Sequence, residues 1–326
     1  MLNCLNPKNG SIVELFTDEL RDFLENNDRG IISGELDYLA LSRVGSERSL
    51  AKEIRFSWEG GSGECTVFLT DELGLTLKKT VSGNSCTFSG LLLGCRYTWY
   101  VSSGSESSQT FSFVTSSLPP RLITVGGISN VRDMGGWSVP GGKIKQGMVY
   151  RGGELEKHMT VTADGLDTLS GQLRIRTQVD LRLESNIDSS PIPGACLAKI
   201  GMRAYATLIN EDSEAIREFF RLAENAGAYP MYIHCWGGAD RTGCICFLLG
   251  AALGMSESDL FTDYELTSLA IWADRSVNSP LFREFYDALK QFGNEDDDLA
   301  ECARKYLLNI GITAEQIQRI KDILLV

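Results

Sequence analysis

Residues 230–243 read Pro-Met-Tyr-Ile-His-Cys-Trp-Gly-Gly-Ala-Asp-Arg-Thr-Gly. The apolar run before the cysteine predicts a short buried strand, and the apolar run that follows the arginine is long enough for a buried helix. Between them, Gly237 and Gly238 allow a tight loop in which backbone N–H groups converge on an anion. A strand, a glycine-containing loop and a helix in this order predict an α/β domain with an anion site at the helix N-terminus.

Two side chains of this loop, Cys235 and Arg241, carry reactive chemistry and are separated by five residues. The thiolate is the nucleophilic form of cysteine, and helix N-termini stabilise it. An arginine fork binds two oxygens of one phosphate. The pair predicts hydrolysis of a phosphate monoester in two steps: Cys235 attacks phosphorus, and water then hydrolyses the phosphocysteine. No metal or organic cofactor is expected. The alternative, an inert buried cysteine, does not explain why glycines, an arginine and a threonine accompany it.

The other residues of the loop are predicted to hold the substrate or to prepare the nucleophile. Backbone N–H groups are expected to bind the phosphate oxygens, and a threonine hydroxyl is placed to assist the thiolate as it leaves. The ring of the tryptophan either walls the site or packs under the loop. His234 is expected to orient the loop from behind through hydrogen bonds. The predicted substrate-binding residues are Trp236, Gly237, Gly238, Ala239 and Thr242.

The string His-Cys-x-x-Gly-x-Asp-Arg-Thr-Gly resembles the tyrosine phosphatases of the bacterial lipid-phosphatase-like group. That group acts on phosphotyrosine, phosphoserine or phosphothreonine, and phosphoinositides. The resemblance covers about residues 121–326 and implies a phosphatase domain with a mixed central sheet flanked by helices. Four further segments are similar to motifs of the group: 130–136 (Asn-Val-Arg-Asp-Met-Gly-Gly), 149–155 (Val-Tyr-Arg-Gly-Gly-Glu-Leu), 179–182 (Val-Asp-Leu-Arg) and 263–267 (Asp-Tyr-Glu-Leu-Thr).

The chain departs from the pattern of this group in two places. Ala239 stands where its best-known members carry a lysine for polyanionic head groups, so a polyphosphorylated inositide is less expected as substrate. The proton donor of the group is an aspartate beyond the Asp-Leu-Arg strand, yet residues 200–205 contain no acid. Asp240 is therefore predicted as the general acid, with Asp212 as the other candidate. An equally weighted alternative makes Asp240 a structural acceptor that fixes loop amides.

Several residues outside the loop are candidates for a supporting role. Asp133 could line the site from a neighbouring loop, although a salt-bridged turn with the preceding arginine is the favoured interpretation. Arg151 and Asp180 are expected either to support the loop or to form a plain structural pair. Cys244 and Cys246 are interpreted as small apolar residues of the loop helix in preference to redox partners of the nucleophile.

The first third of the chain follows a different pattern. Short segments with alternating polarity, such as 53–58 (Glu-Ile-Arg-Phe-Ser-Trp) and 97–101 (Tyr-Thr-Trp-Tyr-Val), are separated by turns rich in Gly, Ser and Asn. This spacing predicts a small antiparallel sandwich, and its last strands resemble a fibronectin type III-like module. Ahead of it, residues 13–26 are predicted to form one amphipathic helix.

Residues 116–120 (Ser-Ser-Leu-Pro-Pro) are the predicted linker, because two prolines exclude both a helix and a central strand. The predicted domains are therefore 1–117, a helix with a fibronectin-like β-sandwich, and 118–326, the α/β phosphatase domain. A length of 326 residues suits two domains. The roles left open for the first domain are binding of a partner, covering of the active site and self-association.

Composition narrows the classes of partner. The net charge of -12 does not favour nucleic acid or an anionic membrane, both of which attract basic surfaces. Nine cysteines without a CxxC pair, and only two histidines, give no support for a metal site and suit a reducing compartment. The N-terminus has no signal-peptide pattern and the chain has no long apolar run, so a cytoplasmic location without membrane insertion is expected. The expected partner is a phosphorylated protein or a small phosphate ester.

Two alternative functions stay open at this point. A catalytically silent phosphate-binding or adaptor protein would use the same loop to bind a phosphorylated ligand without turnover, and the missing acid supports it. An arsenate reductase uses a similar loop and would need resolving cysteines near Cys235. Turnover of an aryl phosphate by the wild type, and its loss on substitution of the nucleophile, separates the phosphatase from both.

Overall fold

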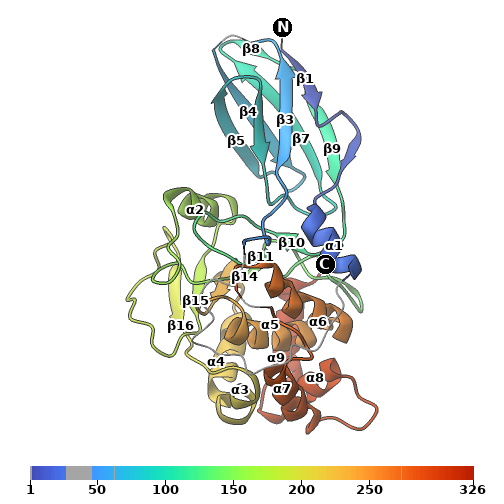
Figure 1. Cartoon of the computed structure of the whole chain (residues 1–326), viewed down its shortest axis with the longest axis vertical. Helices are drawn as coiled ribbons and strands as arrows, with labels where there is room; N and C mark the ends of the chain where they lie inside the picture. The colour runs from blue at the N-terminus through green and yellow to red at the C-terminus, as the bar shows by residue number, and fades with distance from the viewer. Residues whose placement is uncertain (1, 27–45, 62, 273) are drawn as a thin grey trace. The chain divides into compact units, whose positions relative to one another are not determined.

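The computed structural model describes residues 2–26, 46–61, 63–272 and 274–326. The chain divides into two compact units (Figure 1). The first unit comprises Met1–Thr17 and Ala51–Ile123, and the second comprises Asp18–Leu50 and Thr124–Val326. Each unit has its own hydrophobic core.

The first unit consists of two β-sheets around an aromatic core. One sheet has the antiparallel order β1-β3-β6, and the other has the order β2-β9-β7-β4-β5, in which only the β2–β9 pair is parallel. Burial alternates along β3 and β4, which confirms the predicted period of two. The strands of these two sheets are β1 (Asn3–Asn6), β2 (Ser11–Val13), β3 (Ile54–Glu59), β4 (Glu64–Asp71), β5 (Thr76–Ser82), β6 (Ser85–Phe88), β7 (Arg96–Ser103), β8 (Glu106–Ser107) and β9 (Phe111–Thr115). The short strand β10 (Arg121–Leu122) lies in neither of them.

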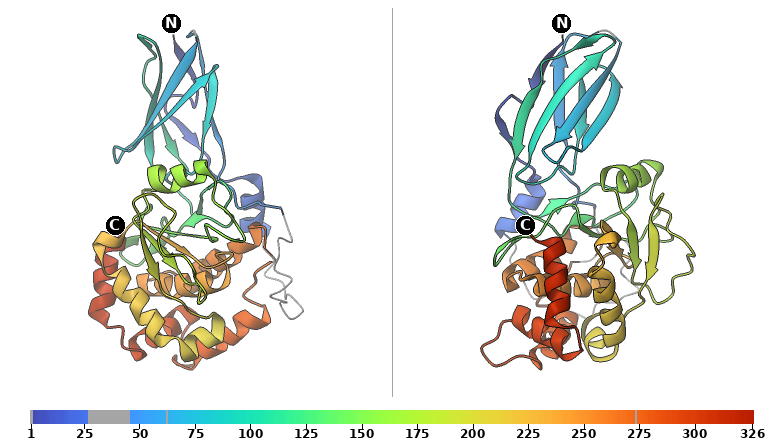
Figure 2. Two further views of the ribbon diagram at one scale, coloured as in Figure 1. Left: turned by 90° about the vertical axis from the view of Figure 1, so that its left-hand side faces the viewer. Right: turned by 180° about the vertical axis from the view of Figure 1, so that it is seen from behind.

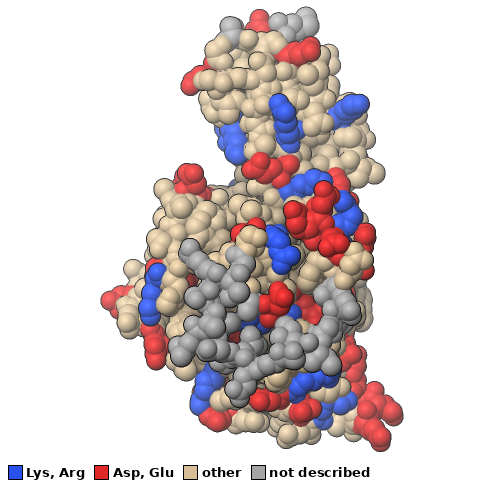
Figure 3. Space-filling view, in the orientation of Figure 1, with Lys and Arg blue, Asp and Glu red and all other residues tan. Residues whose placement is uncertain are grey.

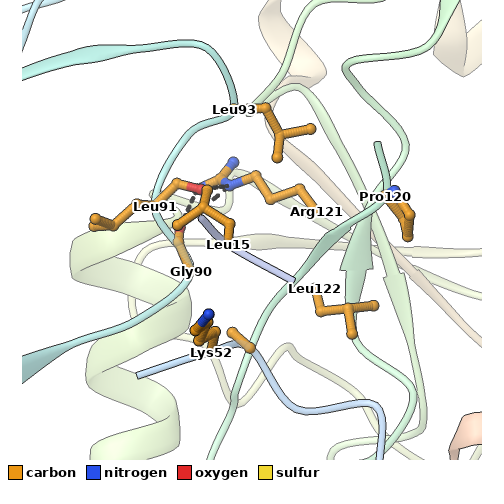
Figure 4. A pocket seen from close by; sticks show the side chains of 9 residues that line it. Leu15, Lys52, Gly90, Leu91, Leu93, Pro120, Arg121 and Leu122 are labelled. Atoms are coloured by element: carbon orange, nitrogen blue, oxygen red, sulfur yellow. Dashed lines mark hydrogen bonds between the residues drawn. The ribbon is translucent and has the colours of Figure 1, made fainter. Parts of the chain in front are cut away.

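A buried arginine extends this unit beyond the predicted linker. Arg121 is 5% exposed, and its guanidinium donates to the carbonyl oxygens of Gly90 (2.7 Å) and Leu91 (3.0 Å), as Figure 4 shows. The side chains of Leu15 and Leu122 lie beside it around a cavity of about 10 Å³, on the order of what one water molecule needs. These bonds attach residues up to 123 to the first unit, so the boundary falls later than the predicted position after residue 117.

The second unit is built on a mostly parallel sheet. Strands β14, β17, β15 and β16 are parallel neighbours in that order, and β11 adds to β14 in the antiparallel direction. Its short strands are β11 (Arg132–Asp133), β12 (Ser138–Val139), β13 (Gly142–Lys143), β14 (Val149–Gly152), β15 (Thr177–Asp180), β16 (Cys196–Lys199) and β17 (Met231–His234). The predicted mixed central sheet is thus confirmed, and the strand expected before Cys235 is β17.

Helices fill most of the remainder of the second unit, and Figures 1 and 2 show α3 to α9 grouped together. Helix α5 is buried over nearly its whole length, as the long apolar run predicts. A capping box formed by Thr313 and Gln316 begins α9. The helical segments are α1 (Asp18–Asn26), α2 (Ala163–Asp167), η1 (Thr168–Gln172), α3 (Tyr205–Glu211), α4 (Ser213–Ala223), η2 (Ala226–Ala228), α5 (Asp240–Leu253), α6 (Glu257–Glu265), η3 (Leu266–Leu269), α7 (Pro280–Lys290), α8 (Leu299–Asn309) and α9 (Ala314–Leu324).

The segment before the first gap differs from its prediction. A single helix was expected over residues 13–26, but the helix begins at Asp18 because Val13 pairs with Thr115 at the edge of a sheet in the first unit. Residues 46–50 also belong with the second unit and not with the sandwich. The N–H of Arg48 donates to the carbonyl oxygen of Leu269 at 2.7 Å, which attaches this segment to η3.

The described residues contain no helix long and apolar enough to cross a membrane. Acidic and basic side chains are interspersed over the described part of the face drawn in Figure 3. All nine cysteines are free thiols, and only Cys196 is exposed. Within the described ranges, no group of three or more His, Cys, Asp or Glu side chains could hold a metal ion.

Candidate active site

The cysteine loop lies at the carboxyl ends of parallel strands, where open α/β sheets bind their ligands. Cys235 directly follows β17, and α5 begins five residues later at Asp240. The N-cap residue of α5, Ala239, has no side chain that could cap the helix, so the first N–H groups of α5 remain available to an anion. Cys235 itself is 3% exposed.

The carbonyl oxygens of the loop are held from behind. In a trans peptide the C=O of one residue and the N–H of the next point in opposite directions. Each anchored carbonyl therefore directs the following N–H toward the opposite face of the loop. The described part of the chain offers no hydrogen-bond acceptor to the N–H groups of residues 236–239. The four anchors are His234 Nδ1 on Cys235 O (3.0 Å), Glu154 N–H on Trp236 O (2.8 Å), Asn130 Nδ2 on Gly237 O (3.0 Å) and Arg151 Nη2 on Gly238 O (2.9 Å).

Both loop glycines are required by close contacts. Gly238 has φ +66°, and a Cβ there would lie 2.2 Å from the carbonyl oxygen of Gly152. A Cβ at Gly237 would lie 2.8 Å from the indole of Trp272. The glycines therefore let the loop pass between strand β14 and an aromatic ring, which no larger residue permits.

A buried ion-pair network holds two of the anchors. Asp263 accepts from Arg132 Nε at 2.8 Å and from Arg151 Nη1 at 2.5 Å, and both arginines are at most 1% exposed. Burial alone would raise the pKa of Asp263, but the two guanidinium groups outweigh it and hold that pKa below its usual value. Arg132 also donates to Asn130 Oδ1 at 2.6 Å, which fixes the amide that holds Gly237. The network makes the loop geometry rigid before any ligand binds.

His234 is a neutral hydrogen-bonding residue behind the nucleophile. It is fully buried, and burial lowers its pKa. Nδ1 lies 3.0 Å from the carbonyl oxygen of Cys235, which can only accept, so Nδ1 carries the proton. Nε2 then accepts from the side-chain amide of Gln178 at 2.9 Å. This arrangement agrees with the predicted role of His234 in orienting the loop.

Arg241 lies at the open side of the loop without a carboxylate partner among the described residues. Its guanidinium carbon is 5.2 Å from the centroid of the Trp236 ring, and that tryptophan is 42% exposed. Trp236 therefore stands at the edge of the site and does not pack under the loop. Thr242 is fully buried, and its hydroxyl has no hydrogen-bond partner in the described part of the chain.

Comparison with known proteins places this site in a family. The family profile described as "Tyrosine phosphatase family" matches residues 123–326. The chain belongs to the tyrosine phosphatase family. A protein of Cupriavidus necator named "Putative tyrosine-protein phosphatase H16_A0669" is 28% identical over an alignment of 167 residues, and the match covers 42% of this chain and 59% of that protein. The chain thus matches under two thirds of the length of this relative.

Two solved structures of Siw14 also resemble part of the chain. The core catalytic domain of the PP-IP phosphatase SIW14 from S. cerevisiae in complex with citrate is 18% identical, with a TM-score of 0.33 over 50% of this chain and 89% of that chain. A structure of the Siw14 catalytic core is 17% identical, with a TM-score of 0.33 over 49% and 86% of the two chains.

The predicted acid, Asp240, forms an ion pair. Its carboxylate accepts from Arg275 Nε at 2.8 Å and from Nη2 at 3.1 Å, and the hydroxyl of Tyr205 also donates to it. Burial alone would raise the pKa of Asp240, but Arg275 outweighs it and lowers that pKa. An ionised, fully bonded carboxylate is a poor proton donor. These contacts favour the alternative that Asp240 is structural, although it bonds side chains and not the loop amides that were expected.

Residues 200–205, where the resemblance places the general acid, contain Tyr205 and no acidic residue. Tyr205 is 2% exposed, has φ +57°, and lies 2.9 Å through its hydroxyl from that of Tyr264. The other acid candidate, Asp212, accepts from the N–H of Arg203 at 2.6 Å and from its guanidinium. Both candidate carboxylates are thus engaged with arginines.

The remaining predicted residues, Arg151, Asp180 and Asp133, each have different partners. Arg151 contacts the loop directly, as expected of a support, and its ion-pair partner is Asp263. Asp180 pairs with Arg182 at 2.8 Å, so Arg151 and Asp180 do not form a pair with each other. Asp133 accepts from the N–H groups of Gly135 and Gly147, each at 2.7 Å, and so stabilises a turn.

Cys244 and Cys246 are buried in α5. Burial raises the pKa of Cys246 to about 12 and also raises that of Cys244, which accepts from the N–H of Tyr205 at 3.2 Å. Thiols in this state are unreactive, which supports their interpretation as small apolar residues.

The sequence did not predict the contacts that two residues of the segment after η3 make with the loop and with the first residue of α5. Trp272 contacts Gly237, and Arg275 binds Asp240. No motif marks this segment, because its two functional contacts come from a tryptophan and an arginine in an irregular stretch.

Proposed function

We propose that the second unit is a cysteine-dependent phosphatase that hydrolyses aryl phosphate monoesters, phosphotyrosine among them, through a phosphocysteine. The observation that carries the proposal is the set of four anchored carbonyls, which leaves the N–H groups of residues 236–239 unbonded next to Cys235. A tetrahedral dianion needs such converging donors, because charge develops on its equatorial oxygens during transfer. Family membership supports the same reaction class.

The proposed first step is attack of the Cys235 thiolate on phosphorus, with the alkoxide or phenoxide leaving in line. Arg241 is available for two phosphate oxygens, because no carboxylate competes for it within the described ranges. In the second step water attacks the phosphocysteine, and the thiolate leaves. Thr242 carries a buried hydroxyl without a partner, which supports the proposal that it donates to the departing sulfur.

The ion pair of Asp240 supports the choice of aryl over alkyl esters. A phenoxide is a far better leaving group than an alkoxide, so an aryl ester depends less on protonation by an acid. If the site has no efficient proton donor, aryl phosphates are the esters that it can still cleave. Phosphoserine, phosphothreonine and phosphoinositides have alkyl leaving groups and are expected to turn over more slowly.

The test compares phosphate release from phenyl phosphate by the wild type, Cys235→Ser, Arg241→Lys and Cys196→Ser. The last variant removes the single exposed thiol and serves as the matched control. We expect turnover by the wild type and by the control, none by Cys235→Ser, and a loss of at least about a hundredfold in Arg241→Lys, which keeps the charge but loses the fork. Rapid acid quench of the wild type should trap a phosphocysteine.

Wild type without turnover between mildly acidic and neutral pH would reject the phosphatase and leave a phosphate-binding module. Asp240→Asn separates the two interpretations of that residue. A structural role predicts equal losses on phenyl phosphate and on an alkyl phosphate. A general acid predicts a much larger loss on the alkyl ester, whose leaving group needs the proton.

For the first unit we propose a fibronectin type III-like module that binds a partner or a second copy of the chain. Sedimentation equilibrium over a wide concentration range tests self-association. A monomer at every concentration would leave only binding of a different partner.

A further inference from the structure

A cluster of cationic and aromatic side chains stands at the exposed side of the phosphate loop. The ring centroid of Trp236 lies 5.3 Å from that of His158, and Lys157 Nζ lies 5.9 Å from it. The guanidinium of Arg241 contacts the same ring at 5.2 Å. We call Lys157, His158 and Trp236 the rim. Lys157 Nζ and the guanidinium carbon of Arg241 each lie within 5.9 Å of the Trp236 ring centroid, so the two cationic groups are less than twice 5.9 Å apart.

The rim is held in place by the buried residues around it. Glu154 is fully buried and accepts from the N–H of His158 at 2.6 Å, while its own N–H donates to Trp236 O at 2.8 Å. Leu155 and Met159 are each 1% exposed on either side of the turn. Lys157 has φ +100°, an unfavourable conformation for a residue with a Cβ. A strained residue next to a reactive loop, fixed by buried neighbours, is typical of a functional position.

The carboxylates near the rim are bound by an arginine and not by Lys157. Arg182 binds Glu154 at 2.6 Å, Asp180 at 2.8 Å and also Glu156, although its single charge offsets only one of these three. No carboxylate of the described ranges pairs with Lys157, which is exposed. Lys157 and Arg241 are therefore two cationic groups at one ring, and neither forms an ion pair with a described carboxylate.

We propose that the rim is a specificity site, in which Lys157 binds the carboxylate of an acidic residue next to the phosphotyrosine of a peptide substrate. This inference rests on the proposed function. Arg241 and the loop amides bind the phosphate, and Lys157 binds a second anion less than twice 5.9 Å away, a distance of at most about three to four extended peptide residues. Ala239 gives the loop no positive charge of its own, and Lys157 provides one from a neighbouring turn.

The experiment measures kcat/KM at low ionic strength on two matched phosphotyrosyl peptides, one with aspartates and one with alanines beside the phosphotyrosine, and on phenyl phosphate. The variants are Lys157→Met, Lys157→Arg and, as a control of equal charge, Lys321→Met in α9. Methionine keeps both the long side chain and the strain at φ +100°, which glycine would relieve. Circular dichroism and the unfolding midpoint establish that each variant is folded.

We expect the wild type, Lys157→Arg and Lys321→Met to prefer the acidic peptide by up to about fivefold, the upper end of the range for an exposed ion pair. Lys157→Met should lose that preference while phenyl phosphate turnover stays within about twofold of wild type. Salt should reduce the preference in the wild type and leave Lys157→Met unaffected.

Wild type that cleaves phenyl phosphate but shows no preference between the peptides overturns the rim proposal alone. Equal losses on all three substrates in Lys157→Met also overturn it and assign Lys157 a structural role. Inositol bisphosphate is included as a further substrate. A higher kcat/KM on it than on the acidic peptide, with a larger dependence on Lys157, would reject the peptide in favour of a second phosphate. Wild type inactive on every substrate would reject the proposed function and this inference with it.

Discussion

Asp263→Asn is predicted to destabilise the second unit strongly, because this carboxylate neutralises two buried guanidinium groups. Arg132 and Arg151 are 1% and 0% exposed and contact Asp263 at 2.8 and 2.5 Å. Removing one member of a buried ion pair costs about 3–5 kcal/mol, since the partner charge remains desolvated. An asparagine oxygen still accepts from one arginine, so we expect about 3–5 kcal/mol in total and not twice that amount. With about 2–4 °C per kcal/mol for a domain of this size, the midpoint falls by roughly 6–20 °C.

The assay is denaturant unfolding of wild type and Asp263→Asn, with Asp287→Asn as control. Asp287 is exposed in α7, and its substitution should stay within about 0.5 kcal/mol of wild type. The folded pKa of Asp263 is lowered, so its contribution is present above the unfolded pKa and is lost as pH falls through the folded pKa. The difference between wild type and variant should therefore shrink in acid. A cost below about 1 kcal/mol at pH 7 would refute the reasoning from buried charge.

Three further predictions concern the loop. Gly238→Ala should stay folded but lose about a hundredfold or more in kcat/KM on phenyl phosphate, because φ +66° and the contact with Gly152 force the loop to move; a loss under threefold would contradict this. Thr242→Val should keep or raise the unfolding midpoint, since it removes an unbonded buried hydroxyl, while rapid-quench kinetics should show slower hydrolysis of the phosphocysteine. Asp240→Asn should destabilise the protein at neutral pH and progressively less in acid. The pKa of Asp240 is lowered in the folded state, so its contribution to stability is lost as pH falls through that folded pKa. A cost in denaturant unfolding that does not change with pH would contradict the ion pair with Arg275.

Much of the fold could be predicted because the relevant signals are local. The apolar run before Cys235 and the one after Arg241 gave β17 and α5, and the alternation in the first third gave β3 and β4. The domain boundary was harder, because it depends on contacts between distant residues. Arg121 belongs to the first unit only through its bonds to Gly90 and Leu91, which no pattern near residue 121 indicates.

The site was predictable to the extent that it is contiguous in sequence. The loop motif identified Cys235 and Arg241, but their environment comes from segments far along the chain. Asp240 could be taken for a free acid only because Arg275, its partner, lies 35 residues later in a stretch without a motif. The same holds for Lys157, whose contact with Trp236 depends on the turn fixed by Glu154.

The pairing of these charges explains how an acidic chain can hold a phosphate dianion. A free carboxylate beside the loop would repel the substrate at short range, where screening by salt is weak. Four buried acids around the loop are matched by four buried arginines: Asp263 has Arg132 and Arg151, Asp240 has Arg275, and Asp180 and Glu154 share Arg182. Arg241 is the arginine of the loop that no described carboxylate engages. The buried arginines therefore act on the substrate indirectly, because by offsetting these four charges they reduce the repulsion that would oppose Arg241 and the loop amides.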